Sequence, residues 1–185
     1  MTRRIPGWTF AAAFAVQAVL VAGLLADRAW LFATGTEIRL PVVPVDPRDL
    51  FRGDYVVLNY SISNLDRSTL AGDGTFTAGE PIYVTLVRDG EGWRAAAIHH
   101  ARPGEGTVLR GIVRGADTNC TQPCGRYLVD YGLEQFFVPE GAGRALETLR
   151  DGQHVSVDVA IGPDGRAALK RLLVDGTVRY EDRIF

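Results

Sequence analysis

The sequence has little excess charge of either sign, a single lysine and only two cysteines. Its 20 basic residues nearly balance 22 acidic ones, so the composition lacks the basic footprint of a nucleic-acid-binding protein. Lys170 is the only candidate for any mechanism that needs a lysine amine. A chain of 185 residues suits one domain with an appendage.

A long apolar run stands out near the N-terminus. The 19 residues from Trp8 to Ala26 carry no charge and as a helix would cover about 28 Å, close to the hydrocarbon thickness of a bilayer. Arg3 and Arg4 precede the run, whereas Asp27 and Arg28 nearly cancel behind it. The positive-inside rule therefore predicts a single-pass protein of the inner (cytoplasmic) membrane, with its N-terminus in the cytoplasm and residues 27–185 in the periplasm or another extracytoplasmic space.

A cleaved secretory signal is the alternative interpretation of the same run. Signal h-regions are shorter, about 7–15 residues, and small residues are needed at positions −3 and −1 of the cut. A cut after Ala26 places Leu24 at −3, which fits poorly, and Ala33-Thr34-Gly35 lies well beyond the run. The pattern favours an uncleaved anchor.

Cys120 and Cys124 are consistent with an extracytoplasmic domain. Two cysteines in such a domain predict a disulfide, here closing a small ring worth about 2 kcal/mol in the loop-entropy model. A metal site is the alternative, with His99, His100 or His154 as further ligands, but the spacing differs from that of common zinc sites. We therefore expect the disulfide, with no metal and no cofactor.

The chain divides into three parts: residues 1–27 as the cytoplasmic N-terminus and anchor, 28–52 as a connector, and 53–185 as the external domain. The connector contains Pro41, Pro44 and Pro47. Asp46-Pro47-Arg48-Asp49 predicts one capped helical turn, which Gly53 would end in a left-handed conformation.

Three short matches recur in the same order along the domain. Two have an offset of 72 residues and the third an offset of 70: Gly53–Val57 with Gly125–Val129, Arg94–Ala96 with Arg166–Ala168, and Gly106–Val108 with Gly176–Val178. Repetition at this period predicts two similar units packed together. The predicted fold class is mainly β with minor α: an antiparallel β domain built from two units of about 72 residues and preceded by one transmembrane helix.

Each predicted unit contains a first strand, a connection and a hairpin. The first strands are Tyr55–Ile62 and Tyr127–Leu133, and the hairpins pair 82–87 with 93–98 and 155–161 with 166–173 through Gly/Asp turns. The connections differ: Ser63–Gly79 is predicted to be a polar loop, whereas Glu140–Arg150 has the spacing of a short amphipathic helix.

The strand that starts at Tyr55 opens with the most specific motif in the chain, Gly53-Asp54-Tyr55-Val56-Val57-Leu58-Asn59-Tyr60. Alternate strand residues share a face, so Leu58 and Tyr60 are predicted to lie in the core. Asp54 is interpreted either as a cap of the preceding turn or as a binding residue, which would pair with Arg126 or Arg52.

The motif matches the signature Gly-Asp-Tyr-x-x-Leu-x-Tyr, and the chain resembles the GDYXXLXY family of bacterial membrane-anchored proteins. The lead-in Val45–Arg48 with Arg52, and the block Tyr131–Gly141 followed by Gly143-Arg144, also resemble this family. Its members look like companions of polytopic membrane proteins. The resemblance implies a topology and a membrane-protein partner, and it implies no established reaction.

The leading hypothesis is a membrane-anchored domain that binds a membrane-protein partner and has no catalytic activity; a small-molecule ligand is left open. The predicted binding patch comprises Arg48, Arg52, Gly53, Asp54, Tyr55, Glu134 and Arg144. The alternative is a hydrolase. A signal-peptidase-like mechanism would need Lys170 with a serine; a Ser-His-Asp site would recruit Ser61, Ser63, Ser68 or Ser156 with a histidine; a glycan-acting pair would come from Asp46, Asp49, Asp54 and Glu134.

Overall fold

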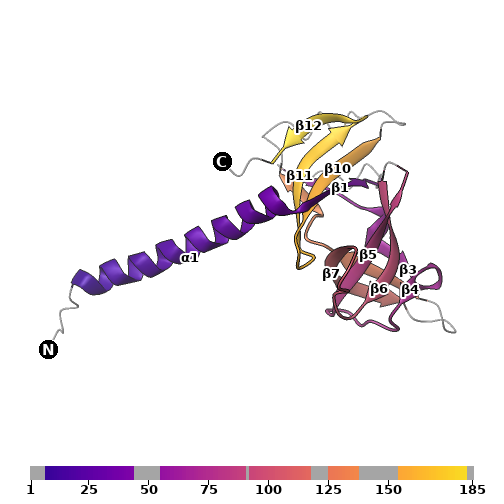
Figure 1. The fold of residues 1–185 in the computed structure, drawn as a ribbon, viewed down its shortest axis with the longest axis horizontal. Helices are drawn as coiled ribbons and strands as arrows, with labels where there is room; N and C mark the ends of the chain where they lie inside the picture. Colours follow the sequence, from indigo (N-terminus) through magenta and orange to yellow (C-terminus); the bar gives the residue numbers. More distant parts are fainter. Residues whose placement is uncertain (1–6, 44–54, 91, 118–124, 138–153, 183–185) are drawn as a thin grey trace.

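The computed structural model describes residues 7–43, 55–90, 92–117, 125–137 and 154–182. The chain is mainly β, with one apolar helix at its N-terminus. Helix α1 (Gly7–Thr34) projects away from the β strands (Figure 1). Its apolar segment Phe10–Thr34 is unburied and is long and apolar enough to cross a membrane.

The helix continues past the predicted boundary at residue 27 and leads directly into a strand. Gly35 donates its N–H to the Leu31 carbonyl at 2.9 Å, and β1 (Thr36–Pro41) starts at the next residue. A side chain at position 35 would meet the Leu31 oxygen at 2.6 Å, which explains the glycine. The segment predicted as a connector thus begins with the end of α1, up to Thr34, and with β1, from Thr36 to Pro41.

A four-stranded antiparallel sheet has the order β1-β10-β11-β12. It combines β1 with three strands from the other end of the chain: β10 (Val155–Ile161), β11 (Ala167–Val174) and β12 (Thr177–Glu181). The predicted hairpin in this region is confirmed, with its turn at residues 162–166. The pairing of Thr36 with Ile161 places this turn close to the end of α1 (Figure 1).

A six-stranded sheet has the order β3-β8-β7-β5-β6-β4. Its long strands are β5 (Pro81–Asp89), β6 (Gly92–His99), β7 (Thr107–Asp117) and β8 (Arg126–Asp130), all antiparallel. The antiparallel pairing of β5 with β6 confirms the predicted hairpin of residues 82–87 with 93–98. The short strands β3 (Asn64–Asp66) and β4 (Ala71–Gly72) lie at the two edges.

The prediction of a polar loop at Ser63–Gly79 is wrong. This segment begins at the last residue of the 3-10 helix η1 (Ser61–Ser63) and contains β3, the 3-10 helix η2 (Arg67–Thr69) and β4. Its apolar residues Leu65, Leu70 and Phe76 are buried and tie the segment to the core. Widely spaced anchors of this kind give no helical or strand periodicity, so the polar residues between them dominated the pattern.

Two strands pair separately, β2 (Tyr55–Val57) with β9 (Gln135–Phe137). Both predicted first strands are therefore shorter than expected. The first ends at Val57, and Tyr60 forms an isolated bridge with Val42 before η1. The second ends at Asp130, because Gly132 adopts a left-handed φ of 75° and turns the chain toward β9.

The structure does not show the two-unit repeat. Tyr55 lies in the two-stranded sheet, whereas Tyr127 lies in the six-stranded sheet, so the two positions are not equivalent. The closing strands also differ: β7 pairs with the first strand of its hairpin, and β12 with the second strand of its own. Of the recurring glycines, Gly106, Gly125 and Gly176 have a positive φ immediately before a strand, an arrangement that is common at turns in antiparallel proteins.

Candidate functional site

The structure describes only part of the predicted binding patch. Arg48, Arg52, Gly53, Asp54 and Arg144 lie outside the described residues, as do the predicted disulfide (Cys120 and Cys124), the capped turn at 46–49 and the helix Glu140–Arg150. The backbone of Tyr55 pairs with Phe137 in β2 and β9. The proposed pairing of Asp54 with Arg126 or Arg52 also falls outside the description.

Tyr60, the last residue of the signature, and Tyr131, the first residue of the block Tyr131–Gly141, are buried and hold two segments together. Tyr60 is 2 % exposed and donates its hydroxyl to the Leu133 carbonyl at 2.7 Å. Tyr131 is 6 % exposed and donates its hydroxyl to the Ile62 carbonyl at 2.6 Å. Each segment therefore supplies a phenol to a carbonyl of the other. We call these four residues and Glu134 the tyrosine clasp.

Glu134 completes the clasp from both its backbone and its side chain. Its carbonyl accepts the Leu58 N–H at 2.8 Å, and its carboxylate accepts the Tyr131 N–H at 2.6 Å. The predicted binding residue is thus half-buried and engaged within its own domain. Leu58 is 2 % exposed, so the signature residues Leu58 and Tyr60 both lie in the core.

The environment of the clasp keeps both phenols protonated. Burial, followed by the nearby Glu134 charge, raises the pKa of Tyr60 and of Tyr131 well above the ordinary tyrosine value. Both hydroxyls therefore remain hydrogen-bond donors across the physiological pH range. The two phenols thus act as hydrogen-bond donors that brace the two segments against each other.

A second cluster joins α1 to the four-stranded sheet. Asp27 accepts two hydrogen bonds from Arg166, at 2.8 and 3.0 Å, and Arg28 donates to Asp182 at 3.1 Å. Lys170 reaches the Phe32 carbonyl at 3.4 Å and the Glu37 carboxylate at 3.0 Å. We call these contacts the helix junction. The charges after the apolar run do not end the helix because the sheet supplies their counter-charges.

A buried carboxylate lies beside the helix junction, on β10. Asp158 is 3 % exposed and accepts hydrogen bonds from Arg39 of β1, at 2.8 and 3.2 Å, and from Arg171 of β11, at 3.0 Å. Arg171 also contacts Glu37. The sequence carried a signal for this network, since charges interrupt three otherwise apolar strands, but it did not show which charges would face each other.

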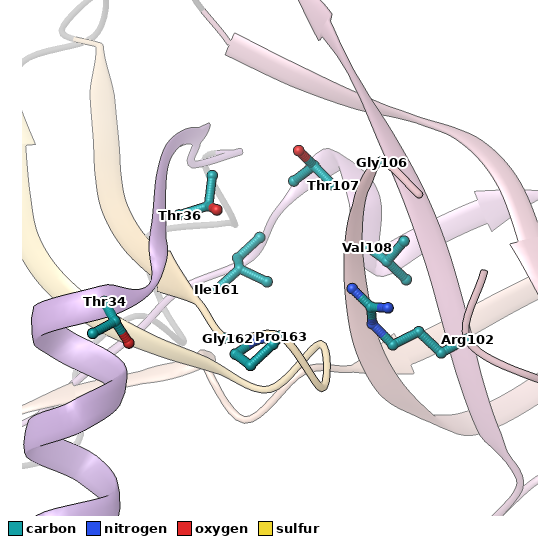
Figure 2. Close-up of a pocket in the computed structure, with 9 residues that line it drawn as sticks. All are labelled: Thr34, Thr36, Arg102, Gly106, Thr107, Val108, Ile161, Gly162 and Pro163. Atoms are coloured by element: carbon teal, nitrogen blue, oxygen red, sulfur yellow. The ribbon is translucent and has the colours of Figure 1, made fainter. Parts of the chain in front are cut away.

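A cavity of about 310 Å³ lies between the end of α1, the turn of β10 and β11, and the loop before β7 (Figure 2). Its walls carry the side chains of three threonines, one arginine and several apolar residues: Thr34, Thr36, Arg102, Gly106, Thr107, Val108, Ile161, Gly162 and Pro163. A second cavity of about 240 Å³ lies between Arg28, Gly132, Gln135, Asp182 and β11.

Of the residues considered for catalysis or metal binding, the structure describes the three histidines, the four serines, Lys170 and Glu134. His99 ends β6, His100 stacks on Phe76 at 4.1 Å, and His154 precedes β10. In the described ranges, no group of three or more His, Cys, Asp or Glu side chains is arranged to hold a metal ion. Ser156 pairs with Leu173, and not with Lys170, which binds Glu37 and Phe32.

The helix and the sheets define a small β protein with one apolar N-terminal helix. The family model described as GDYXXLXY protein matches residues 17–172, and the chain belongs to this family. No curated protein and no solved structure matches the chain. The match begins within α1 and includes the tyrosine clasp and the helix junction apart from Asp182.

Proposed function

We propose that this protein is a single-span membrane protein whose β domain binds a membrane-protein partner outside the cytoplasm and has no catalytic activity. The observation that carries the proposal is the rigid connection between α1 and the four-stranded sheet. Only Gly35 separates the helix from β1, and the helix junction fixes the last turns of α1 against β11 and the end of β12.

A rigid connection has a purpose when the domain must present one surface in one orientation. A domain that only needs to stay near the membrane is served equally well by a flexible linker. Here Asp27 and Arg166 form a two-bond pair, and the Lys170 amine caps the Phe32 carbonyl near the helix end. This arrangement removes orientational freedom before binding, which lowers the entropic cost of docking to a neighbour in the same membrane.

The composition of α1 supports an uncleaved membrane anchor. Trp8 and Trp30 are 71 % and 67 % exposed and lie 22 residues apart, about 33 Å along the helix. Tryptophans at this separation match the two aromatic belts of a spanning helix. Cleavage near Ala33 would also remove Asp27, Arg28 and Phe32, the helix residues that contact the domain. We infer that the N-terminus is cytoplasmic because Arg3 and Arg4 precede the span.

The placement of Lys170 supports a binding protein over a hydrolase. A lysine base must lie within hydrogen-bond reach of its nucleophile and lose its proton. Lys170 instead donates to the Glu37 carboxylate and the Phe32 carbonyl. The buried phenols of the tyrosine clasp likewise serve packing, so the described residues supply no ready catalytic pair.

The proposal predicts that partner capture depends on the rigid connection. A flexible Gly-Ser insertion after Gly35 should leave the domain folded and abolish chemical crosslinking to the partner in native membranes. The matched control is the same insertion after Gly74, an exposed position with nothing packed against it. Crosslinked products would be identified by mass spectrometry after purification of the full-length protein. Equal capture by both insertion variants would contradict the proposed role of the junction.

A further inference from the structure

The cavity at the end of α1 lies where a membrane-anchored chain leaves the bilayer. The helix rises about 10 Å between Asp27, at the end of the uncharged run, and Thr34 in the cavity wall. The headgroup layer of a bilayer is about 5–8 Å thick on each side. If Asp27 marks the edge of the hydrocarbon, the cavity lies at the level of the headgroups or just above it.

The turn between β10 and β11 is held at the same level. Arg166, at the end of this turn, binds Asp27, and Gly162 and Pro163 of the turn line the cavity. The turn is also fixed from the other side, because the Arg110 N–H donates to the Gly165 carbonyl at 2.8 Å. The left-handed Gly165 allows this close approach, since a side chain there would lie 3.3 Å from the backbone of Arg110. The cavity is therefore bounded by elements that are fixed relative to α1.

The cavity wall has the charge and the donors for an anion. Arg102 is the only charged residue among the nine that line the cavity, and none of them is a carboxylate. Figure 2 shows the Arg102 side chain directed from its loop toward Ile161 and Pro163. In the described part of the chain, its only hydrogen bond is to the Pro103 carbonyl, at 3.1 Å, which leaves further N–H groups of the guanidinium for a ligand.

The hydroxyls of the wall add donors around Arg102. Thr36 and Thr107 lie on the wall opposite Pro163 in Figure 2, whereas the Thr34 hydroxyl donates to the Trp30 carbonyl at 2.8 Å. One guanidinium with neutral hydroxyls matches the single negative charge of a phosphate diester better than a phosphate dianion. The apolar side chains of Val108, Ile161 and Pro163 provide contact area for the carbon atoms attached to such a phosphate.

We propose that this cavity binds the phosphodiester of a phospholipid headgroup, with Arg102 as the charged contact. The inference rests on the proposed membrane anchor, since a chain without that anchor would not hold the cavity at the membrane surface. Its size of about 310 Å³ is at the lower end for ligand sites, which suits a headgroup better than a whole lipid. The acyl chains would remain in the bilayer beside α1.

The test is native mass spectrometry of the full-length protein titrated with phosphatidylglycerol. We expect one lipid to bind, and Arg102→Gln to weaken its binding by about tenfold or more, because a charge-assisted contact is lost. Arg114→Gln is the matched control: it removes an exposed arginine from β7, the strand that follows the Arg102 loop, six residues beyond Val108, and should change binding less than about twofold. Thr107→Val keeps the charge and should weaken binding by several-fold.

Three results would overturn the inference. Equal lipid binding by the wild type, Arg102→Gln and Arg114→Gln would show that the headgroup does not use the cavity. Equal weakening by both arginine variants would indicate unspecific charge attraction. Inorganic phosphate or glycerol phosphate that binds as tightly as the lipid, and depends on Arg102, would assign the site to a soluble phosphate. Carbonate extraction of membranes distinguishes failure of this inference from failure of the proposed function. Release of the protein by carbonate would contradict the membrane anchor itself, whereas a protein that stays in the membrane but fails the lipid tests contradicts only the lipid site.

Discussion

Removing one hydroxyl from the tyrosine clasp tests whether the signature tyrosine is a structural residue. Tyr60→Phe preserves the ring in the core and deletes the hydrogen bond to the Leu133 carbonyl, which is 2.7 Å long and buried. The carbonyl is then left without that donor in a site that water does not reach. The cost of such an unsatisfied group is about 1–3 kcal/mol, so we expect the free energy of unfolding to fall by about 2 kcal/mol.

Thermal unfolding of the full-length protein in detergent, followed by near-ultraviolet circular dichroism, measures this loss. For a chain of this size, about 2 kcal/mol corresponds to a decrease in Tm of about 4–8 °C. Tyr131→Phe should produce a decrease of similar size, since it deletes the reciprocal bond to Ile62. Tyr83→Phe on β5 is the control, because Tyr83 is only half-buried, and it should change stability by less than about 0.5 kcal/mol. A decrease for Tyr60→Phe no larger than that of the control would refute the reasoning.

Three further predictions concern stability and pH. Gly111→Ala should cost about 1–3 kcal/mol in chemical denaturation, because the new methyl group would lie 2.4 Å from Val129 and 3.0 Å from Tyr131; a stability equal to wild type would contradict this packing. Asp158→Ala should cost about 3 kcal/mol, since it leaves two arginines without their buried carboxylate, whereas an unchanged denaturation midpoint would show that water replaces it. Burial opposes ionisation of Asp164, but its hydrogen bonds from the Arg166 side chain and backbone prevail and lower the pKa of Asp164. Its stabilising contribution is therefore complete above about pH 4 and is lost as the pH falls through the lowered value, and Asp164→Asn should flatten the pH dependence of unfolding below about pH 4.

Local patterns predicted the local elements well. The apolar run at residues 8–26 lies within α1, and both hairpins follow the strand alternation and Gly/Asp turns that predicted them. The pairing of distant segments was not predictable. Nothing in the sequence near Glu37 indicates that β1 pairs with β10, because antiparallel registry across more than 100 residues is decided by the packing of the whole core.

The candidate sites illustrate the same limit. The signature identified Leu58 and Tyr60 as core residues from their spacing on one strand. It did not reveal the reciprocal tyrosine bonds, since Tyr131 lies 71 residues further on and the predicted strand ends at Val57, which leaves Ile62 in η1. The repeat matches did not identify equivalent strands, because Tyr55 pairs with β9 whereas Tyr127 pairs with β3 and β7.

In the proposed topology, with the β domain outside the cytoplasm, the composition of the four-stranded sheet sets an order of assembly. The segments after α1 emerge from the membrane in the order of the sequence, so β1 appears first, directly beside the bilayer. Its partner strand β10 begins only at Val155. The strands of the six-stranded sheet, from Asn64 to Asp130, emerge in between and need no residue from either end for their pairing. The part of the domain nearest the anchor is therefore completed last. Until β10 emerges, one edge of β1 stays open beside the export machinery, available to chaperones or to a second chain.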